Sequence, residues 1–303
     1  MPLGRTLRKV VQTLSLLGAR SPATYYQFLG DDVLEGHSSG FSRSADQPLW
    51  LNLGFWESAR TYPEAARAMA RLVGDAARLD AESELLDVGF GFAEQDFFFI
   101  DAYNPKHISG VNITPLHVDQ ANRRVRERGL EQRFDLRLGS ATDLPFADQR
   151  FDAVTAIECA FHFDTRQAFF EEAFRVLKPG GRLVTADGAT TEAQPKLGVF
   201  SRMLLKRWSV PLANMYDKHE YRARLCQAGF SDVQITSIRQ HVFPGCSKYR
   251  KLRDRGIPMN EAVVELTQEE IDRVLNLDKW ALHGFTDYLL VCAVKPHEEG
   301  ART

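Results

Sequence analysis

The sequence lacks several features that would place it in common classes of protein. Only 4 of its 303 residues are cysteines, and they form no Cys-x-x-Cys pair. Neither a zinc site nor a disulfide framework is indicated, and a reducing cytoplasm is the expected location. The formal net charge is −2, which gives no electrostatic argument for nucleic acid as a partner. No apolar run approaches the roughly 18 residues of a membrane span.

The N-terminal segment has too few consecutive apolar residues for a signal peptide. Its apolar stretch is brief and is interrupted by polar residues such as Gln12 and Ser15. We instead predict an amphipathic helix over residues 1–20. Residues 21–56 are rich in glycine, serine and aromatic side chains. They are expected to form a loop that is either a lid over a ligand or an apolar plug on the edge of a sheet.

We expect two parts in the chain. A lid of helix and aromatic loop occupies residues 1–60, and an α/β core occupies residues 61–303. Partly apolar, helical stretches near 190–225 and 243–283 are predicted to be insertions that cap the core. A surface for a homodimer is the alternative interpretation of the second stretch.

The most informative stretch is Glu84–Asp96. A short apolar run ends in Asp87-Val88-Gly89-Phe90-Gly91-Phe92-Ala93, which predicts a buried parallel strand, a tight turn and the start of a helix. Glycines let a backbone approach a ligand closely, and the start of a helix offers free N–H groups to an anion. The stretch therefore predicts a loop that binds a nucleotide-type cofactor.

Two kinds of cofactor compete for this loop. A nicotinamide dinucleotide needs Gly-x-Gly-x-x-Gly, but Glu94 stands at the third position, where it would repel a pyrophosphate. The other pattern is Asp/Glu-x-Gly-x-Gly-x-Gly at the end of the strand. Residues 87–93 match it except at Ala93. An oxidoreductase is therefore disfavoured.

Alternating strands and helices over residues 84–188 predict a doubly wound, mostly parallel sheet. The predicted strands are residues 84–89, 107–113, 134–138, 151–157, a strand ending at 187, 233–238 and 286–294; the predicted helices include residues 61–79, 114–128, 166–177 and 221–228.

Three further segments follow the loop in order. They are GSATDLPF at 139–146, FDAVTAI at 151–157 and RVLKPGGRL at 175–183. With residues 87–93 they resemble the motifs of class I S-adenosylmethionine-dependent methyltransferases, especially small-molecule enzymes that tailor sugars, polyketides and peptides in natural-product biosynthesis. The resemblance implies a Rossmann-like sheet of seven strands with the last one antiparallel. It also implies S-adenosylmethionine as cofactor and S-adenosylhomocysteine as product.

The resemblance also implies which residues hold the cofactor. Asn112 stands where an acid usually grips the ribose, so a charge-assisted hydrogen bond is lost. Ser140 stands where an Asp usually accepts from the adenine amino group, and its hydroxyl is a weaker acceptor. The expected cofactor-binding residues are Asn52, Trp56, Asp87, Gly89, Gly91, Ala93, Gln95, Asn112, Ile113, Ser140, Ala141, Thr142, Ile157 and Glu158.

His162 and Asp187 are the candidate catalytic residues. Methyl transfer to a hydroxyl needs the nucleophile held in line and a general base, and His suits neutral pH. Both residues follow strands whose carboxyl ends meet at the ligand edge of the sheet. The resemblance to sugar O-methyltransferases implies that Asp187 orients His162. The alternative is that His162 only lines the pocket and Asp187 only caps a turn.

Aromatic side chains near the predicted site suggest an apolar or ring-bearing acceptor. The candidates for substrate binding are Tyr25, Phe161, Phe163, Phe200 and Trp208. No His, Asp or Glu residues have the spacing of metal ligands, so no metal is expected.

Three functional hypotheses remain. The first is an O-methyltransferase that acts on a small, largely apolar natural product, with His162 as general base. The second is a C- or N-methyltransferase on a terpenoid, indole or amine, which can need less help from a base. The third is a protein that binds S-adenosylmethionine without transferring its methyl group, because Ala93, Asn112 and Ser140 depart from the family pattern.

Overall fold

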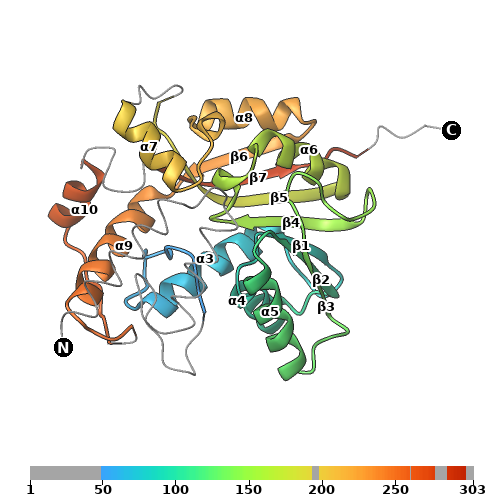
Figure 1. Cartoon of the computed structure of the whole chain (residues 1–303), viewed down its shortest axis with the longest axis horizontal. Coiled ribbons are helices and arrows are strands. Elements are labelled where there is room, and N and C mark those ends of the chain that lie inside the picture. Colours follow the sequence, from blue (N-terminus) through green and yellow to red (C-terminus); the bar gives the residue numbers. More distant parts are fainter. Residues whose placement is uncertain (1–48, 193–197, 260, 277–284, 298–303) are drawn as a thin grey trace.

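The computed structural model describes residues 49–192, 198–259, 261–276 and 285–297. These residues form one seven-stranded sheet with helices on both of its faces (Figure 1). The strands are β1 (Glu84–Val88), β2 (His107–Asn112), β3 (Phe134–Leu138), β4 (Phe151–Ile157), β5 (Leu177–Ala189), β6 (Ser231–Ser237) and β7 (Asp287–Val294). The helices are α3 (Tyr62–Ala77), α4 (Glu94–Tyr103), α5 (Pro115–Glu127), α6 (Arg166–Val176), α7 (Val199–Arg207), α8 (Lys218–Gln227), α9 (Arg239–Asp254) and α10 (Gln268–Leu275), with short 3-10 turns η1 (Ala160–His162) and η2 (Leu212–Asn214).

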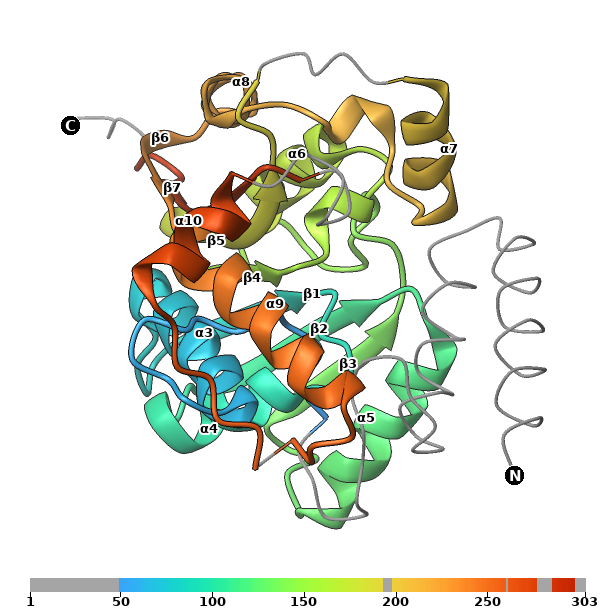
Figure 2. The same cartoon turned by 90° about the vertical axis from the view of Figure 1, so that its left-hand side faces the viewer.

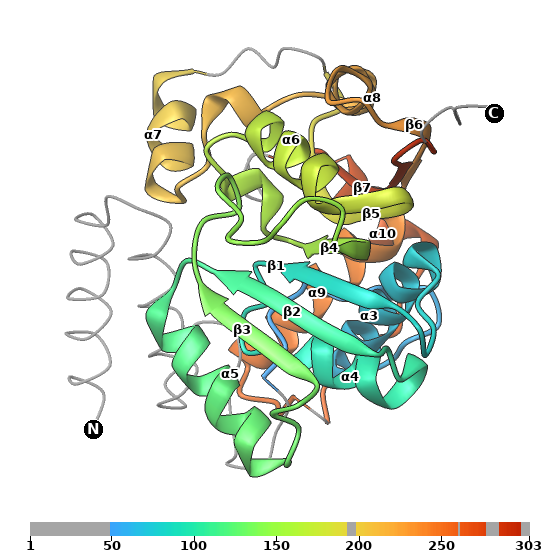
Figure 3. The same ribbon diagram turned by 90° about the vertical axis from the view of Figure 1, so that its right-hand side faces the viewer.

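The strand order is β3-β2-β1-β4-β5-β7-β6. Strands β1 to β5 are parallel to one another, whereas β7 runs antiparallel between β5 and β6. Figure 3 shows β3, β2, β1 and β4 side by side. The predicted α/β class, the doubly wound sheet and the antiparallel last strand are therefore confirmed. The carboxyl ends of β1, β2, β3, β4 and β5 meet at one edge, where open α/β sheets bind ligands.

Each face of the sheet has its own apolar core. One core packs α3, α4, α5 and α9 on the sheet through residues such as Met69, Phe97 and Phe243. The other packs α6 and α8 through residues such as Phe169 and Leu225. Because both faces are covered, the central parallel strands β1 and β4 are buried almost throughout, as predicted for β1.

The predicted turn Pro179-Gly180-Gly181 lies inside the first part of β5. Phe151 pairs with Leu177, but Ala153 already pairs with Arg182, so the residues between them form an irregular bulge in the strand. The strand also runs on to Ala189, two residues past the predicted end. The turn therefore feeds a parallel strand as predicted, and the strand is longer at both ends than the sequence indicated.

The predicted insertion at 243–283 contains the end of α9 and all of α10, which lie side by side (Figure 2). Helix α9 buries Val242, Phe243, Cys246 and Tyr249. An ideal Cβ on Gly245 would lie 2.1 Å from Cγ of Trp56. The helix is thus in direct contact with the segment before α3, and this packing requires a glycine. Residues 260 and 277–283 of the insertion lie outside the described residues, as do residues 193–197 of the insertion near 190–225, the predicted helix 1–20 and loop residues 21–48.

We predict that Gly245→Ala lowers the free energy of unfolding by about 1–3 kcal/mol, the usual cost of overpacking a core. A glycine-to-alanine change inside a helix normally stabilises it by about 1 kcal/mol, so the sign is diagnostic. Urea unfolding measures the difference. Ser247→Ala on the same helix is the control and should leave stability almost unchanged. A Gly245→Ala variant as stable as wild type would contradict the described contact with Trp56.

Candidate active site

The loop after β1 has the backbone that its sequence predicts. Gly89 and Gly91 have φ values of +81° and +57°, and a Cβ on Gly89 would lie 2.6 Å from Sγ of Cys159. Ala93, at the third glycine position, also adopts a left-handed conformation, with φ of 59°, just before α4. The replacement of glycine therefore keeps the turn, although a left-handed residue with a Cβ costs roughly 1–2 kcal/mol.

Two buried carboxyl groups hold this loop from below. Asp87 accepts hydrogen bonds from Thr155 Oγ1 at 2.8 Å and from Gln95 Nε2 at 2.9 Å. Burial raises the pKa of Asp87 to about 6. Asp96, also fully buried, has its pKa raised by burial and then by the charge of Asp87. Burial next to Asp87 therefore favours the protonated form of Asp96. Gln95 Nε2 also donates to the carbonyl of Phe90 at 3.2 Å, so this amide braces the loop, and cofactor contact by Gln95 stays a prediction.

The ends of β2 and β3 present a polar donor and an apolar surface. Oδ1 of Asn112 accepts the backbone N–H of Thr114 at 3.0 Å. Among the described residues nothing accepts from its Nδ2, which is therefore available to a ribose hydroxyl. Ile113 and Leu138 are 46% and 56% exposed, unusual for large apolar side chains. These two side chains suit the flat face of a purine.

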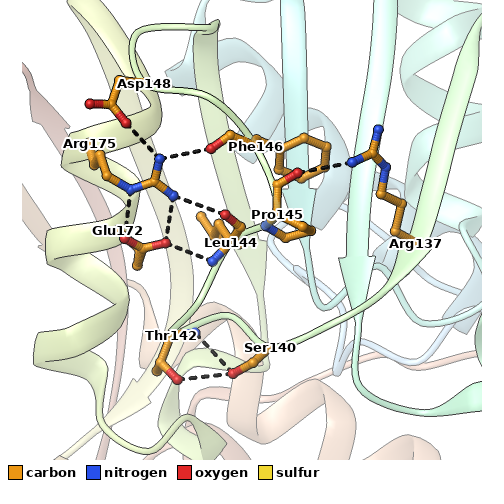
Figure 4. Close-up of polar contacts among 9 residues, drawn as sticks. All are labelled: Arg137, Ser140, Thr142, Leu144, Pro145, Phe146, Asp148, Glu172 and Arg175. Atoms are coloured by element: carbon orange, nitrogen blue, oxygen red, sulfur yellow. Dashed lines mark hydrogen bonds and ion pairs between the residues drawn. The ribbon is translucent and has the colours of Figure 1, made fainter.

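The segment GSATDLPF is fixed by the guanidinium of Arg175 in α6 (Figure 4). Arg175 donates to the carbonyls of Phe146 and Leu144 at 2.8 and 2.9 Å. Its Nη2 and Nη1 also pair with Glu172 at 2.7 Å and Asp148 at 2.8 Å. Glu172 in turn accepts from Leu144 N at 2.7 Å. The first residue of RVLKPGG thus orders the loop that precedes β4.

Ser140 uses its hydroxyl inside the same loop. Its Oγ accepts the backbone N–H of Thr142 at 3.2 Å and lies 2.9 Å from Thr142 Oγ1, as Figure 4 shows. Ala141 is buried between them. The predicted acceptor for an adenine amino group is therefore already engaged in a turn, and a contact with the base would share that oxygen.

Residues 49–56 run across the ligand edge of the sheet as a strap. Glu94 at the start of α4 accepts the N–H of Leu49 at 2.9 Å. Glu158 after β4 accepts the N–H of Leu53 at 2.7 Å. Two carboxylates from different parts of the core therefore hold the strap through its backbone. Glu94, which argued against a dinucleotide, has a structural partner here.

Two predicted cofactor residues in the strap have partners inside the protein. Asn52 donates to the carbonyl of Ala66 at 3.2 Å and accepts from Gly54 N at 2.9 Å. The indole of Trp56 lies 5.9 Å from the ring of Tyr249. Both are buried, so their side chains shape the strap, and cofactor contact by them stays a prediction.

Glu158 lies directly after Ile157, the last residue of β4. Tyr288 Oη donates to Glu158 Oε1 at 2.7 Å, so this oxygen receives two donors, the other being Leu53 N. Burial raises the pKa of Glu158 to about 7, against the effect of these hydrogen bonds. The group can therefore exchange its proton near neutral pH.

His162 lies 7% exposed at the end of η1, following β4. Its Nδ1 lies 3.1 Å from the backbone oxygen of Ser209, after α7. Since a carbonyl only accepts, Nδ1 carries a proton, so a neutral imidazole here has its lone pair on Nε2. The ring of Phe161 lies 4.1 Å from the imidazole, and Phe285 lies 4.8 Å beyond it. The result is an imidazole beside an aromatic wall.

The structure does not pair His162 with Asp187. Asp187 is fully buried, and its Oδ2 accepts from Arg166 Nε at 2.9 Å. Burial raises the pKa of Asp187 to about 6, although Arg166 opposes the shift. The carboxylate is therefore charged at neutral pH and neutralised by Arg166. The predicted His162–Asp187 contact is corrected to an Arg166–Asp187 ion pair, and the Ser209 carbonyl takes the place of Asp187 at the imidazole.

The predicted substrate residues fall into three groups. Phe161 and Phe163 flank His162, and the ring of Phe163 packs on Phe169 at 5.0 Å. Trp208 is half-buried after α7. Tyr25 lies outside the described residues, and nothing is described of the Phe200 side chain. Only the first group is therefore placed beside the candidate base.

Sequence reasoning missed Arg166, Ser209, Asn214 and Tyr288. Each acts through a partner far along the chain, such as Tyr288 on Glu158, 130 residues away. No motif marks them. A buried arginine must have a charged partner, but the sequence does not tell which carboxylate it meets.

The residues at this edge fit the predicted S-adenosylmethionine. The glycines let the cofactor approach the backbone of the loop closely. The Asn112 amide offers a donor, and Ile113 and Leu138 offer an apolar surface. Within the described ranges no group of three or more His, Cys, Asp and Glu residues could hold a metal ion. No helix in those ranges is both long and apolar enough to cross a bilayer.

Comparisons with known proteins agree with this fit. Residues 86–185 match a family model described as a methyltransferase domain. The chain is 35% identical over 260 residues to erythromycin 3''-O-methyltransferase of Saccharopolyspora erythraea, covering 82% of this chain and 84% of the relative. It is 29% identical to 27-O-demethylrifamycin SV methyltransferase of Amycolatopsis mediterranei, covering 77% and 87%.

Two solved structures show the same fold. The [4+2]-cyclase SpnF aligns over 92% of this chain and 98% of its own, with a TM-score of 0.68 and 23% identity. Geranyl diphosphate C-methyltransferase from Streptomyces coelicolor A3(2), in complex with Mg2+, geranyl diphosphate and S-adenosyl-L-homocysteine, aligns over 91% and 100%, with a TM-score of 0.64 and 19% identity. At these identities the likeness concerns the fold alone.

We predict that Asp96→Asn makes stability less dependent on pH. A carboxyl whose pKa is raised on folding stabilises the protein at low pH, and this contribution is lost as pH rises through the folded pKa. Wild type should therefore lose stability relative to the variant as pH rises from about 4 to about 7, because the pKa of Asp96 is raised well above the ordinary Asp value of 3.8. Urea unfolding at both pH values measures this, with Asp119→Asn on the surface as control. Parallel pH dependences would contradict the buried acid pair.

We predict that Arg175→Met weakens binding of S-adenosylhomocysteine about tenfold, which corresponds to 1.4 kcal/mol. The change removes the donors that hold the carbonyls of Leu144 and Phe146, so the GSATDLPF loop loses its order. Calorimetric titration gives the affinity, and the exposed Arg126→Met is the control. An unchanged affinity in a folded Arg175→Met variant would show that the loop does not depend on this guanidinium.

Proposed function

The chain belongs to the family of S-adenosylmethionine-dependent methyltransferases, and on this premise we propose that it methylates a hydroxyl of a small natural product, with His162 as general base. The observation that carries the proposal is the imidazole of His162, whose Nδ1 faces the Ser209 carbonyl and whose ring lies against Phe161. The two relatives named above are O-methyltransferases of erythromycin and rifamycin. The 35% identity to a named O-methyltransferase favours a transferring enzyme over a non-transferring binding protein.

Bound S-adenosylmethionine supplies a methyl group on a sulfonium, which is a good leaving group. The protein therefore mainly has to align the acceptor. With the cofactor bound, methyl transfer to an acceptor hydroxyl would require that hydroxyl to lose its proton. Nε2 of His162 takes this proton, because Nδ1 keeps its own against the Ser209 carbonyl. The imidazolium later releases it to solvent.

The surroundings of His162 favour an uncharged, ring-bearing acceptor. Phe161 and Phe285 form an aromatic wall next to the base, and an aromatic ring suits the apolar face of a sugar or of a macrocycle. Arg166, the buried cation nearby, is neutralised by Asp187 and so is not offered to an anionic substrate. We therefore propose a polyketide or glycoside hydroxyl as the acceptor.

The proposal also covers the segments around the acceptor site and the location of the enzyme. We propose that residues 1–60 and the insertions near 190–225 and 243–283 cover the acceptor site, and that the enzyme works in the cytoplasm. C- or N-methylation is the alternative, since Glu158 could face a cationic intermediate at the same edge. The position of the transferred methyl group distinguishes these reactions.

We predict that His162→Ala lowers kcat about 10²-fold or more, the usual contribution of a general base. The affinity for S-adenosylhomocysteine should change little, because the imidazole acts on the acceptor. The probe is 3''-O-demethylerythromycin, the acceptor implied by the name of one relative. The exposed His219→Ala on α8 is the matched control. If His162→Ala turned over the probe at the wild-type rate, His162 would not be the base.

A further inference from the structure

We propose that Asn214 is a positioning residue for methyl transfer, which fixes the turn that carries His162. Asn214 ends η2, on the connection between α7 and α8, and is completely buried. The catalytic meaning of this inference rests on the proposed role of His162. The contacts themselves stand independently of that role.

The side-chain amide of Asn214 holds the backbone on both sides of His162. Its Nδ2 donates to the carbonyl of Phe161 at 3.1 Å and to the carbonyl of Phe163 at 2.7 Å. One NH₂ group thus bridges the residues directly before and after the base. A 3-10 turn of three residues has few hydrogen bonds of its own, so this bridge sets the direction in which the imidazole leaves the backbone.

The acceptors of Asn214 are engaged by Arg166. Oδ1 accepts the backbone N–H of Arg166 at 2.9 Å, and the Asn214 carbonyl accepts from Arg166 Nη1 at 2.6 Å. Arg166 also binds Asp187 through Nε and the carbonyl of Gly188 through Nη2. Asp187 is therefore linked to His162 indirectly, through Arg166 and Asn214, rather than by a direct contact.

Only an asparagine satisfies these partners. The site needs two donors and one acceptor on a short side chain, which an Asn amide provides. An Asp of the same shape would keep the acceptor for Arg166 but place its second oxygen against the two carbonyls. An Ala would leave both carbonyls without this donor. The same connection supplies the Ser209 carbonyl to His162 Nδ1, so it positions the base at two points.

The test uses Asn214→Asp, with Asn214→Ala as a second variant should the first fail to fold. Asn122→Ala is the matched control, because Asn122 Nδ2 also donates to one backbone carbonyl, that of Leu136, at 3.1 Å, but on the β3 side of the sheet. The first readout is the imidazole ¹⁵N spectrum, assigned with His162→Ala. It needs no acceptor, and it reports which ring nitrogen carries the proton.

We expect wild type and Asn122→Ala to show His162 with its proton on Nδ1. The Asn214 variants should shift this imidazole towards the other tautomer or to an average of both. In turnover of 3''-O-demethylerythromycin, the Asn214 variants should lose about 10- to 100-fold in kcat, as expected for a misplaced catalytic group. Their dissociation constant for S-adenosylhomocysteine should stay within about twofold of wild type, because the cofactor loop is untouched.

A double variant that combines Asn214→Asp with His162→Ala tests whether Asn214 acts through His162. If Asn214 works only through His162, its loss has no further effect on kcat once His162 is gone. An equal loss in both backgrounds, or an unchanged Nδ1 tautomer in Asn214→Asp, overturns the positioning role while the proposed function stands. Full activity of His162→Ala overturns the proposed function instead, whatever the spectrum shows.

Discussion

A charge that is buried away from water needs an opposite charge beside it. In this protein the buried charge is the guanidinium of Arg166. Its guanidinium is fully buried and meets Asp187 at 2.9 Å, so neither group can be removed without leaving the other charge unpaired. The remaining donors of Arg166 bind carbonyls at Gly188 and Asn214. The end of β5, the start of α6 and the connection before α8 are therefore joined at one point, directly beside the turn that carries His162.

The same edge of the sheet is organised from its other side by carboxyl groups. Asp87 and Asp96 lie beneath the glycine loop, whereas Glu94 and Glu158 hold the strap of residues 49–56 by its backbone. Burial raises the pKa of several of these acids, which costs stability at neutral pH. The cofactor edge thus carries several buried acids, and the two apolar cores on either face of the sheet offset their cost in stability.

Local patterns in the sequence were sufficient to predict most of the fold. The strands β3 and β4 begin and end at the predicted residues, since alternating or mainly apolar residues between turns are a local signal. The glycine loop was equally readable. The partner of Asp187 could not be predicted from the sequence, because the choice between His162 and Arg166 depends on how η1 and α6 leave the sheet. Asn214 gave no signal in the sequence, since the carbonyls to which it donates belong to residues 51 and 53 positions away.

The most direct test of the account is the position of the methyl group in the product. The enzyme would be incubated with S-adenosylmethionine labelled with ¹³C in its methyl group and with 3''-O-demethylerythromycin, beside a panel of macrocyclic and glycosidic alcohols. Carbon NMR of the products then shows the labelled methyl directly. The account predicts a methoxyl carbon, bonded to an oxygen that was a hydroxyl in the acceptor. A labelled methyl on carbon or nitrogen would contradict it and would leave His162 without a proton to accept from a hydroxyl.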